Sequence, residues 1–407
     1  MNVRFMQRID FYAGVPLCFL LSCASAVRKM AFSRPARFTG GRILCIELSE
    51  IGSTVLAHSA LELMKSSAPD GVYFLIFEKN AGAIEALNVL PRENVIAIDD
   101  RSFPRFAASA LSALRQVRSL KLAAVADFEL FSRFTAILSF LSGAPVRAGF
   151  SNHTNEGLYR GNLLTHPVLY NPHQHMALNL LAVAEGLKGV EDGCFVKHDL
   201  RRALLAPPQV AVAASDEAAA ARLLRDKFPH ADADALDLVL LSPDPGPALP
   251  LRGWASRNYV EVATALLRHS PRIVVGITGL KSSRALAAEI LEAVGMPART
   301  ADFTGETPRI ETLLALLRAA RLLISTDGGS AHLASLCGLK MIVLFGPETP
   351  ALYAPLGAGV TTLFAGLACS PCLSAANHRR SNCRDNRCLQ EITPPMVIAE
   401  ALRKLAP

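Results

Sequence analysis

The sequence contains no dense run of lysine and arginine, although its overall charge is basic. Its 407 residues carry a formal net charge of +7 and a pI near 9.0, which favours anionic partners such as phospholipid headgroups, nucleic acid or a diphosphate-bearing substrate. The basic residues are scattered through amphipathic segments, and aromatic residues make up only 6% of the chain. A nucleic-acid interface gathers basic and aromatic residues on one surface, so no nucleic-acid partner is expected.

Charged residues are scarce in general, at 19% of the chain, whereas apolar residues make up 51%. This composition is typical of a globular α/β protein and excludes a disordered one. A chain of 407 residues exceeds what one ordinary hydrophobic core supports, so two domains of roughly 150–200 residues are expected.

The glycine pattern of a dinucleotide-binding turn is also missing. The first apolar strand segment leads into Glu47–Ser53, which contains a single glycine in place of G-x-G-x-x-G. That pattern brings the backbone close to the pyrophosphate of a dinucleotide. Its absence disfavours a Rossmann-type oxidoreductase.

The nine cysteines are an odd number, which does not fit the disulfide framework of a small secreted protein. A reducing cytosol is therefore expected. Free cysteine often serves as a small apolar core residue. We predict that role for the cysteines inside apolar segments, which are Cys18, Cys23, Cys45, Cys194 and Cys337.

The other four cysteines form the spaced cluster Cys369-x2-Cys372-x10-Cys383-x4-Cys388. Four thiolates at this spacing suit a structural zinc ion, and the arginines between them would offset the thiolate charge. A disulfide or redox pair and four free thiols are the alternatives. The spacing alone does not decide among the three.

Residues 11–27 form a charge-free run, FYAGVPLCFLLSCASAV, followed by the basic residues Arg28, Lys29, Arg34 and Arg37. The run is short for a membrane span, which needs about 20 apolar residues. Asp10 and the basic cluster argue against an exported signal peptide. We favour a segment lying in the cytoplasmic leaflet, held by its basic residues against anionic lipid, and predict that residues 1–40 associate with the membrane.

Apolar strand segments alternate with amphipathic helical segments from residue 42 onward, which indicates parallel, doubly wound sheets. The pattern restarts after a weak linker at Ala206–Pro208. We therefore expect two Rossmann-like domains, residues 41–205 and 206–407, facing a central cleft, with ligands at the carboxyl ends of the strands. The predicted strands are Arg42–Leu48, Gly71–Phe77, Val95–Ile98, Leu122–Asp127, Leu236–Leu241, Arg272–Ile277, Leu322–Ser325 and Met341–Phe345. The predicted helices are Val55–Lys65, Ala81–Leu90, Phe106–Ser119, Asp216–Lys227, Arg257–His269, Ser283–Val294 and Thr312–Ala320.

One predicted strand leads into a turn suited to an anion. It contains Asp327, Gly328 and Gly329, and a helix is predicted to begin at about Ser330. Glycines permit close backbone approach, and the free amides and positive dipole end of a helix suit a diphosphate. His332 in the first helical turn adds a side-chain donor. The alternative is a plain strand-to-helix turn with Asp327 as the N-cap.

The block DGGSAHLASLCGLKMIVLFGPETPALYAPLG, residues 327–357, resembles the C-terminal signature of glycosyltransferase family 9, the lipopolysaccharide heptosyltransferases and their relatives. Other motifs of that family are matched in order. They are Leu249–Trp254 (a basic residue and a tryptophan), Ile277–Gly279 (a strand-end T-G turn), Phe303–Thr307 (a G-x-T segment) and Glu47–Ser53 (the first strand and loop). The resemblance spans residues 42–397.

The resemblance implies a GT-B fold and a metal-independent, inverting transfer that requires no cofactor. The donor would be an ADP-heptose-like nucleotide sugar, and the acceptor a lipopolysaccharide-type or other lipid-linked glycan. Such a transfer needs a base for the acceptor hydroxyl and cationic or N–H groups for the leaving diphosphate. The implied location is the cytoplasm, peripheral to or anchored at the cytoplasmic face of the bacterial inner membrane.

The resemblance also assigns roles to residues of this chain. Arg252 would act on the diphosphate as a catalytic cation, and Asp327 would shape the turn. Gly52 and Ser53 would belong to an acceptor-side loop. The implied donor-binding residues are Thr278, Gly279, Asp327, Gly328, Gly329, Ser330 and His332.

The first loop departs from the family pattern, because Gly52 is followed by Ser53 and not by the aspartate that is the family's base. A serine needs its own activator at neutral pH, so we predict Glu50 of the same loop as the base, ahead of Asp127 and His153.

The family's acidic residue after the T-G turn is also absent, and Ser282–Ser283 stands in its place. These departures argue against heptose and ADP as the sugar and nucleotide of the donor more than they argue against glycosyl transfer. A family member with a different sugar and acceptor, and a catalytically silent nucleotide-sugar-binding protein, are the alternatives.

Three histidines, His166, His173 and His175, lie in a polar segment with asparagine and proline. We predict a solvated loop there. Contact with acceptor phosphates is the alternative.

Overall fold

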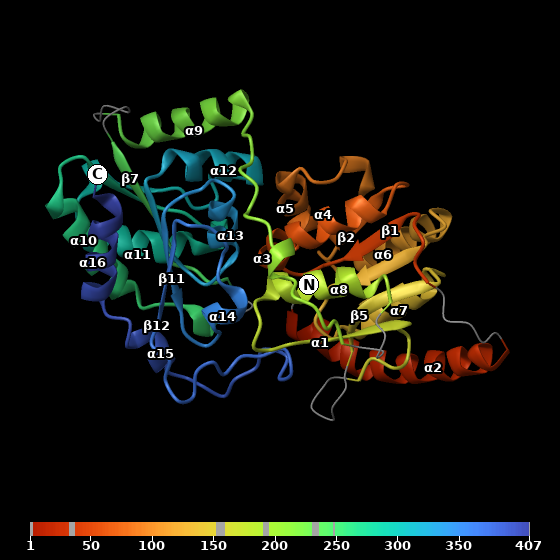
Figure 1. Cartoon of the computed structure of the whole chain (residues 1–407). Helices are drawn as coiled ribbons and strands as arrows, with labels where there is room; N and C mark the ends of the chain where they lie inside the picture. The colour runs from red at the N-terminus through yellow and green to blue at the C-terminus, as the bar shows by residue number, and fades with distance from the viewer. Residues whose placement is uncertain are drawn as a thin grey trace. The chain divides into compact units, whose positions relative to one another are not determined.

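The structure is a computed structural model that describes residues 3–31, 37–151, 159–189, 195–229, 236–246 and 249–406. Arg34, His153 and Cys194 lie outside these ranges. The chain divides into two compact units, Met1–Leu205 and Ala206–Pro407. Each unit contains one six-stranded parallel sheet with helices packed against it (Figure 1).

The sheet of the first unit has the strand order β3-β2-β1-β4-β5-β6. Its strands are short and apolar because helices cover both faces: α6 and α7 pack on the face that carries Leu44 and Ile46, and α4 and α8 pack together. The strands are β1 (Ile43–Ile46), β2 (Val72–Phe77), β3 (Val95–Ile98), β4 (Ala124–Asp127), β5 (Val146–Ser151) and β6 (His166–Leu169). The helices on this sheet are α3 (Ile51–Leu56), α4 (His58–Ser67), α5 (Ala81–Leu87), α6 (Phe103–Ser119), α7 (Arg133–Leu141) and α8 (Met176–Gly186).

The sheet of the second unit has the order β12-β11-β10-β7-β8-β9. Helices α10 and α16 pack side by side on one face around Trp254 and Tyr259 (Figure 1). The strands are β7 (Asp237–Ser242), β8 (Ile273–Ile277), β9 (Thr300–Asp302), β10 (Leu322–Thr326), β11 (Met341–Phe345) and β12 (Val360–Phe364). The α-helices are α9 (Ala214–Lys227), α10 (Ser256–His269), α11 (Arg284–Val294), α12 (Ile310–Ala319), α13 (Gly329–Ser335), α14 (Pro350–Tyr353), α15 (Arg387–Gln390) and α16 (Pro394–Leu405).

Both sheets have the same strand order when each is counted from its own first strand: third, second, first, fourth, fifth, sixth. The chain leaves the first strand toward one side of the sheet and the fourth strand toward the other, so their loops diverge at the carboxyl ends and leave room for a ligand. These switch points lie between β1 and β4 in the first unit and between β7 and β10 in the second.

The strands predicted at Val95–Ile98 and Met341–Phe345 are confirmed residue for residue. The helix predicted at Val55–Lys65 is wrong in its bounds, because Ala57 separates α3 from α4. The solvated loop predicted around His166 is also wrong. His166 begins β6, pairs with Ala148 of β5 and is 7% exposed.

The N-terminal run folds as two helices, α1 (Val3–Tyr12) and α2 (Gly14–Ala31), that pack against α7. Asp10 Oδ1 accepts hydrogen bonds from the backbone amides of Arg133 and Phe134, both at 2.9 Å, and Asp10 Oδ2 lies 3.1 Å from Arg133 Nη1. Asp10 therefore caps the first turn of α7 from outside the helix. Gly14 permits the close approach, because a Cβ there would lie 2.7 Å from Arg133 Cβ.

The outward side of these two helices is apolar. Segment Phe5–Val27 is long and apolar enough to cross a membrane by composition, and only 17% of its hydrophobic window is buried. Large apolar side chains that remain exposed along it are Phe5, Phe11, Tyr12, Leu17, Phe19, Leu20 and Val27.

Candidate functional site

Arg252 lies at the switch point of the second sheet, next to the turn that follows β10. It ends the short 3-10 helix Pro250–Arg252 after β7, and Trp254 secures this segment by donating its indole N–H to Ile392 O at 2.9 Å. Arg252 Nη1 donates to Asp327 O at 3.2 Å, and Arg252 Nε lies 3.3 Å from Asp327 Oδ2. The structure thus brings together two residues that are 75 positions apart in the sequence.

Glu348, in the turn after β11, is the second carboxylate on Arg252. Its side chain is 1% exposed and pairs with Arg252 through Oε2 and with Arg379 Nε through Oε1, the latter at 3.1 Å. Arg379 comes from the cysteine-bearing segment 369–388, which is held to the β11 turn by a hydrogen bond from Cys372 N to Pro347 O at 2.9 Å. A buried carboxylate shared by two guanidinium groups is therefore part of the site.

The four charged groups of this cluster sum to zero when all are ionised: Arg252 and Arg379 against Asp327 and Glu348. Burial raises the pKa of Asp327, and the charge of Arg252 opposes that rise. A carboxyl group of raised pKa takes up a proton more readily when an anion arrives nearby. The cluster is electrically neutral with all four groups ionised, and protonation of Asp327 would leave it with a net positive charge.

The turn before α13 offers backbone amides to an anion. Gly328 is the N-cap with extended backbone (φ −172°), and a Cβ added to it would meet only Thr326 O, at 3.9 Å. Ser330 Oγ accepts from Ser242 Oγ at 3.2 Å, and His332 is 4% exposed. Helix α13 is only seven residues long. The charge of Arg252 would therefore attract an anion more strongly than the dipole of this helix.

Thr278 and Gly279 follow β8, at the same edge of the second sheet. Thr278 is 2% exposed and its amide donates to Leu241 O at 2.9 Å, while Gly279 O accepts from Gly305 N at 2.9 Å. Ser283 Oγ donates to Asp244 Oδ2 at 2.5 Å. Asp244, after β7, therefore places a carboxylate near the T-G turn, where the sequence carries serines.

At the first unit's switch point, Glu50 and Ser53 lie together at the start of α3. Glu50 is the N-cap, and its Oε2 accepts from Ser53 Oγ at 3.2 Å. Gly52 lies in the first turn of the same helix. The acceptor-side loop predicted from the sequence is thus the first turn of α3, with Ser53 7% exposed.

The carboxylate of Asp127, at the end of β4, belongs to a buried network of one ion pair and hydrogen bonds. Its carboxylate is 0% exposed, pairs with Arg160 Nη2 and accepts from Thr135 Oγ1 at 3.0 Å. Burial raises its pKa, and the charge of Arg160 opposes the rise. Because no oxygen of Asp127 reaches solvent, its geometry suits a structural role better than that of a base.

Glu129, two residues later, reaches the loop after β1. Its Oε1 accepts from Leu48 N at 2.8 Å, Ser49 N at 3.0 Å and Ser49 Oγ at 2.9 Å. Burial raises its pKa, and the carboxylate of Asp127 adds to the rise, whereas the donors from Leu48 and Ser49 oppose it.

The structure gives the predicted zinc site no support. In the described part of the chain, which includes the cysteines at 369–388, no group of three or more His, Cys, Asp or Glu is placed to hold a metal ion, and these thiols are free. Of the cysteines predicted in the core, Cys18 and Cys45 are buried. Cys23 is exposed on α2, so the prediction is wrong for it.

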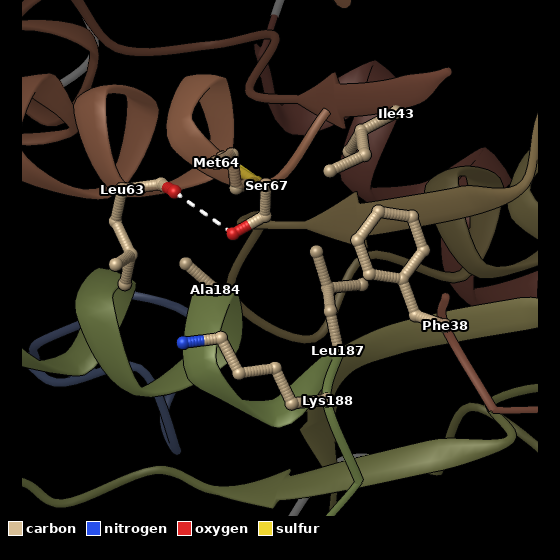
Figure 2. A pocket seen from close by; sticks show the side chains of 8 residues that line it. All are labelled: Phe38, Ile43, Leu63, Met64, Ser67, Ala184, Leu187 and Lys188. Carbon is tan, nitrogen blue, oxygen red and sulfur yellow. Dashed lines mark hydrogen bonds between the residues drawn. The ribbon is translucent and has the colours of Figure 1, made fainter. Parts of the chain in front are cut away.

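A small cavity between α4 and α8 is a packing gap and not a ligand site. Its volume is about 10 Å³, enough for one water molecule at most, and apolar side chains such as Met64 and Leu187 line it (Figure 2). Ser67 Oγ beside it already donates to Leu63 O at 3.3 Å (Figure 2). Because Ile43 begins β1, the cavity lies at the amino end of the sheet, opposite the switch point.

Sequence reasoning missed Glu348, Arg379, Glu129 and Asp244 as members of these two sites. Glu348 stands in the block FGPETP, but nothing local marks it as the partner of a residue 96 positions earlier. Glu129 and Asp244 each follow a strand that borders a switch point. Their position directly after such a strand was the sequence signal that could have identified both residues.

Known proteins share this fold and these motifs. The structure of E. coli ADP-heptose lps heptosyltransferase II has a TM-score of 0.67 at 17% identity, covering 89% of this chain and 98% of that one. The glycosyl transferase family 9 structure from Veillonella parvula DSM 2008 has a TM-score of 0.66 at 18% identity, covering 91% of this chain and 98% of that one. At these identities the likeness shows the fold, and two doubly wound parallel sheets of this kind define a GT-B glycosyltransferase fold.

The sequence matches the family model of glycosyltransferase family 9 (heptosyltransferase) over residues 133–381, more than half of the chain. The chain belongs to this family, and the resemblance stated from its motifs is confirmed. Lipopolysaccharide heptosyltransferase 2 of Salmonella typhimurium (strain LT2) is 27% identical over 109 residues, 26% of this chain and 30% of that protein. This match thus spans less than a third of the length of the curated relative.

Proposed function

We propose that the protein is an inverting glycosyltransferase that moves a heptose-like sugar from a nucleotide-diphosphate sugar to a lipid-linked glycan of the lipopolysaccharide type. The observation that carries the proposal is the guanidinium of Arg252, held by two carboxylates beside the open backbone of Gly328. Cations and amides in this arrangement stabilise the charge that develops on a leaving diphosphate. An ADP-heptose-like donor is supported by the likeness in fold to the E. coli ADP-heptose lps heptosyltransferase II.

In this mechanism the second unit holds the donor and the first unit holds the acceptor. Arg252 and the amides of residues 328–330 bind the diphosphate, and Thr278 and Gly279 border the rest of the nucleotide. A carboxylate at the first unit's switch point takes the proton of the acceptor hydroxyl, and Glu50 is the candidate that the sequence supplies. No metal or cofactor is required.

Gly328→Val tests the donor site without disturbing the fold. The extended backbone of Gly328 accommodates any residue, and the space for its Cβ is open, so we expect the free energy of unfolding to change by less than about 1 kcal/mol. A valine would occupy the space proposed for the diphosphate. We expect the dissociation constant for ADP to rise at least tenfold, about 1.4 kcal/mol, in calorimetric titration.

The exposed Ala351 provides a control for this variant, because Ala351→Val also adds apolar bulk to the second unit. It should bind ADP as the wild type does. Wild-type affinity in Gly328→Val would contradict the site. A thermal-shift panel of other nucleoside diphosphates and of nucleotide sugars then identifies the nucleobase and the sugar of the donor.

A nucleotide-sugar-binding protein without transferase activity is the second candidate, and Ser53 in place of the family's aspartate favours it. The two differ in product formation. Binding of a nucleotide sugar without transfer to any lipid-linked glycan, at protein concentrations near that of the donor, supports the silent protein.

We further propose that α1 and α2 seat the protein on the cytoplasmic face of the bacterial inner membrane, in the plane of the surface. Supporting this, the buried side of α2 is occupied by unit contacts such as Ser22 Oγ accepting from Asn162 N at 2.7 Å, while the other side is apolar and exposed. A span would have to break the contacts of Asp10 with α7. An amphipathic segment in the interface keeps them.

Replacing both Leu17 and Leu20 with glutamine should weaken binding to vesicles of phosphatidylglycerol and phosphatidylethanolamine at least about tenfold in a sedimentation assay. Burying one leucine side chain contributes about 1.5–3 kcal/mol, and the two side chains are 48% and 62% exposed. Leu280→Gln, at a 66% exposed position of the other unit, is the control. Unchanged binding of the double variant would contradict the proposed face.

A further inference from the structure

We infer that Glu129 is the general base that takes the proton of the acceptor hydroxyl. Ser53, which stands at the position of the family's aspartate, has no carboxylate to serve in this role. The inference rests on the proposed function. It begins from the topology: Glu129 follows β4 and Glu50 follows β1, so both carboxylates border the switch point where a ligand of this sheet binds.

Three donors hold the Glu129 carboxylate within the loop after β1. All three bind Oε1, at 2.8–3.0 Å, and two of them are backbone amides. Among the residues that the structure describes, none donates a hydrogen bond to Oε2. One oxygen thus fixes the group in place, and the other is left to accept a proton.

The surroundings of Glu129 suit a base better than those of Glu50 or Asp127. Glu50 already accepts from Ser53 Oγ through Oε2 and is the N-cap residue of the six-residue helix α3. Asp127 is sealed by Arg160 and Thr135. Glu129 is half-buried, and the neighbouring Ser49 is exposed.

The charged neighbours of Glu129 tune its proton affinity. Burial and the nearby Asp127 raise the pKa of Glu129, and Asp127 is itself paired with Arg160. A base whose pKa lies closer to the working pH accepts a proton more readily. Because the ionised form is the active one, the transfer rate should rise with pH through the pKa of this group.

The proposed step balances as a single displacement. The acceptor oxygen forms a bond to the anomeric carbon of the donor sugar, the bond from that carbon to the diphosphate oxygen breaks, and the nucleoside diphosphate leaves with the electron pair. The acceptor O–H bond breaks, and its proton moves to Glu129 Oε2. The proton is then released to solvent.

Glu129→Gln is the test, because a glutamine Oε1 accepts the same three hydrogen bonds while its amide cannot act as a base. With ADP-heptose and a lipid-linked lipopolysaccharide acceptor, we expect kcat to fall about 10²–10⁴-fold. The thermal midpoint and the ADP dissociation constant should stay at wild-type values. The acid limb of the wild-type pH–rate profile should be lost in this variant.

Glu50→Gln is measured in parallel as the matched comparison. A Glu129→Gln variant that keeps transfer within about threefold of wild type, while Glu50→Gln loses it, overturns the inference and leaves the proposed function intact. Loss of activity only in Glu129→Ala, together with a lower thermal midpoint, assigns Glu129 a purely structural role and also overturns it. A wild-type protein that binds no ADP and transfers no sugar overturns the proposed function itself.

Discussion

Arg160→Met should lower the free energy of unfolding by about 3–5 kcal/mol, because it leaves a buried carboxylate without its counter-ion. Asp127 is 0% exposed and Arg160 is 5% exposed. Arg160 also donates to Phe150 O at 3.0 Å, so its loss removes a tie between the segment at residue 160 and β5. Urea unfolding followed by circular dichroism measures the change.

The pH dependence of this variant follows from the sign of the pKa shift. Burial raises the pKa of Asp127 and the charge of Arg160 opposes the rise, so in Arg160→Met the folded state takes up a proton at pH values where the unfolded aspartate has released it, and the variant loses stability as the pH rises. Without Arg160 the rise is larger. The stability lost by Arg160→Met should therefore shrink as the pH is lowered from 8 to 5.

The double variant Asp127→Asn with Arg160→Met is the control for this mechanism. Removing both charges leaves no uncompensated ion, so we expect it to recover at least half of the stability lost in the single variant and to show little pH dependence. A double variant as unstable as the single one would attribute the loss to packing and hydrogen bonds of Arg160 alone.

Arg252→Met should abolish detectable ADP binding and lower the free energy of unfolding by about 3 kcal/mol. The change leaves Asp327 without its ion pair and Glu348 with Arg379 as its remaining one, and breaking a buried pair from one side is strongly destabilising. Asp327 can limit the loss by taking up a proton, since burial already raises its pKa. Calorimetric titration with ADP and urea unfolding report the two effects separately.

Two variants separate charge from geometry at this position. Arg252→Lys keeps the charge and loses the planar fork that bridges two carboxylates, so it should retain part of the ADP affinity. Arg268→Met removes an exposed arginine at the end of α10 and should leave both measurements at wild-type values. Full ADP affinity in Arg252→Met would refute the donor site as drawn.

The alternation of apolar strands and amphipathic helices predicts eight of the twelve strands that the structure describes, including the edge strand β3. Strands β5, β6, β9 and β12 escaped prediction; β6 contains Pro167, and β9 has only three residues. Helix α8 was missed because its sequence, MALNLLAVAEG, is apolar nearly all round and shows no amphipathic period. A periodic apolar pattern therefore predicted most strands, whereas α8, which lacks such a pattern, was missed.

The two sites divide along the same line. The approach of Arg252 to the Asp327 turn follows from topology, because both residues come after strands at a switch point. The role of Arg379 does not follow from any local pattern. Arg379 pairs with Glu348 from a segment in which His378 and Arg379 both adopt left-handed backbone (φ 52° and 53°). Neither residue is a glycine, so the sequence does not predict this conformation.

The hydrogen bonds between Asp10 and α7 connect the apolar helices α1 and α2 to the segment that follows β4, at the carboxyl edge of the first unit's sheet. Arg133, whose amide Asp10 caps, is only four residues beyond Glu129. A protein resting on a bilayer through α1 and α2 would search for a lipid-borne acceptor in two dimensions and not three. Confinement of both molecules to one thin layer raises their effective concentration, so α1 and α2 would increase the encounter rate without touching either substrate.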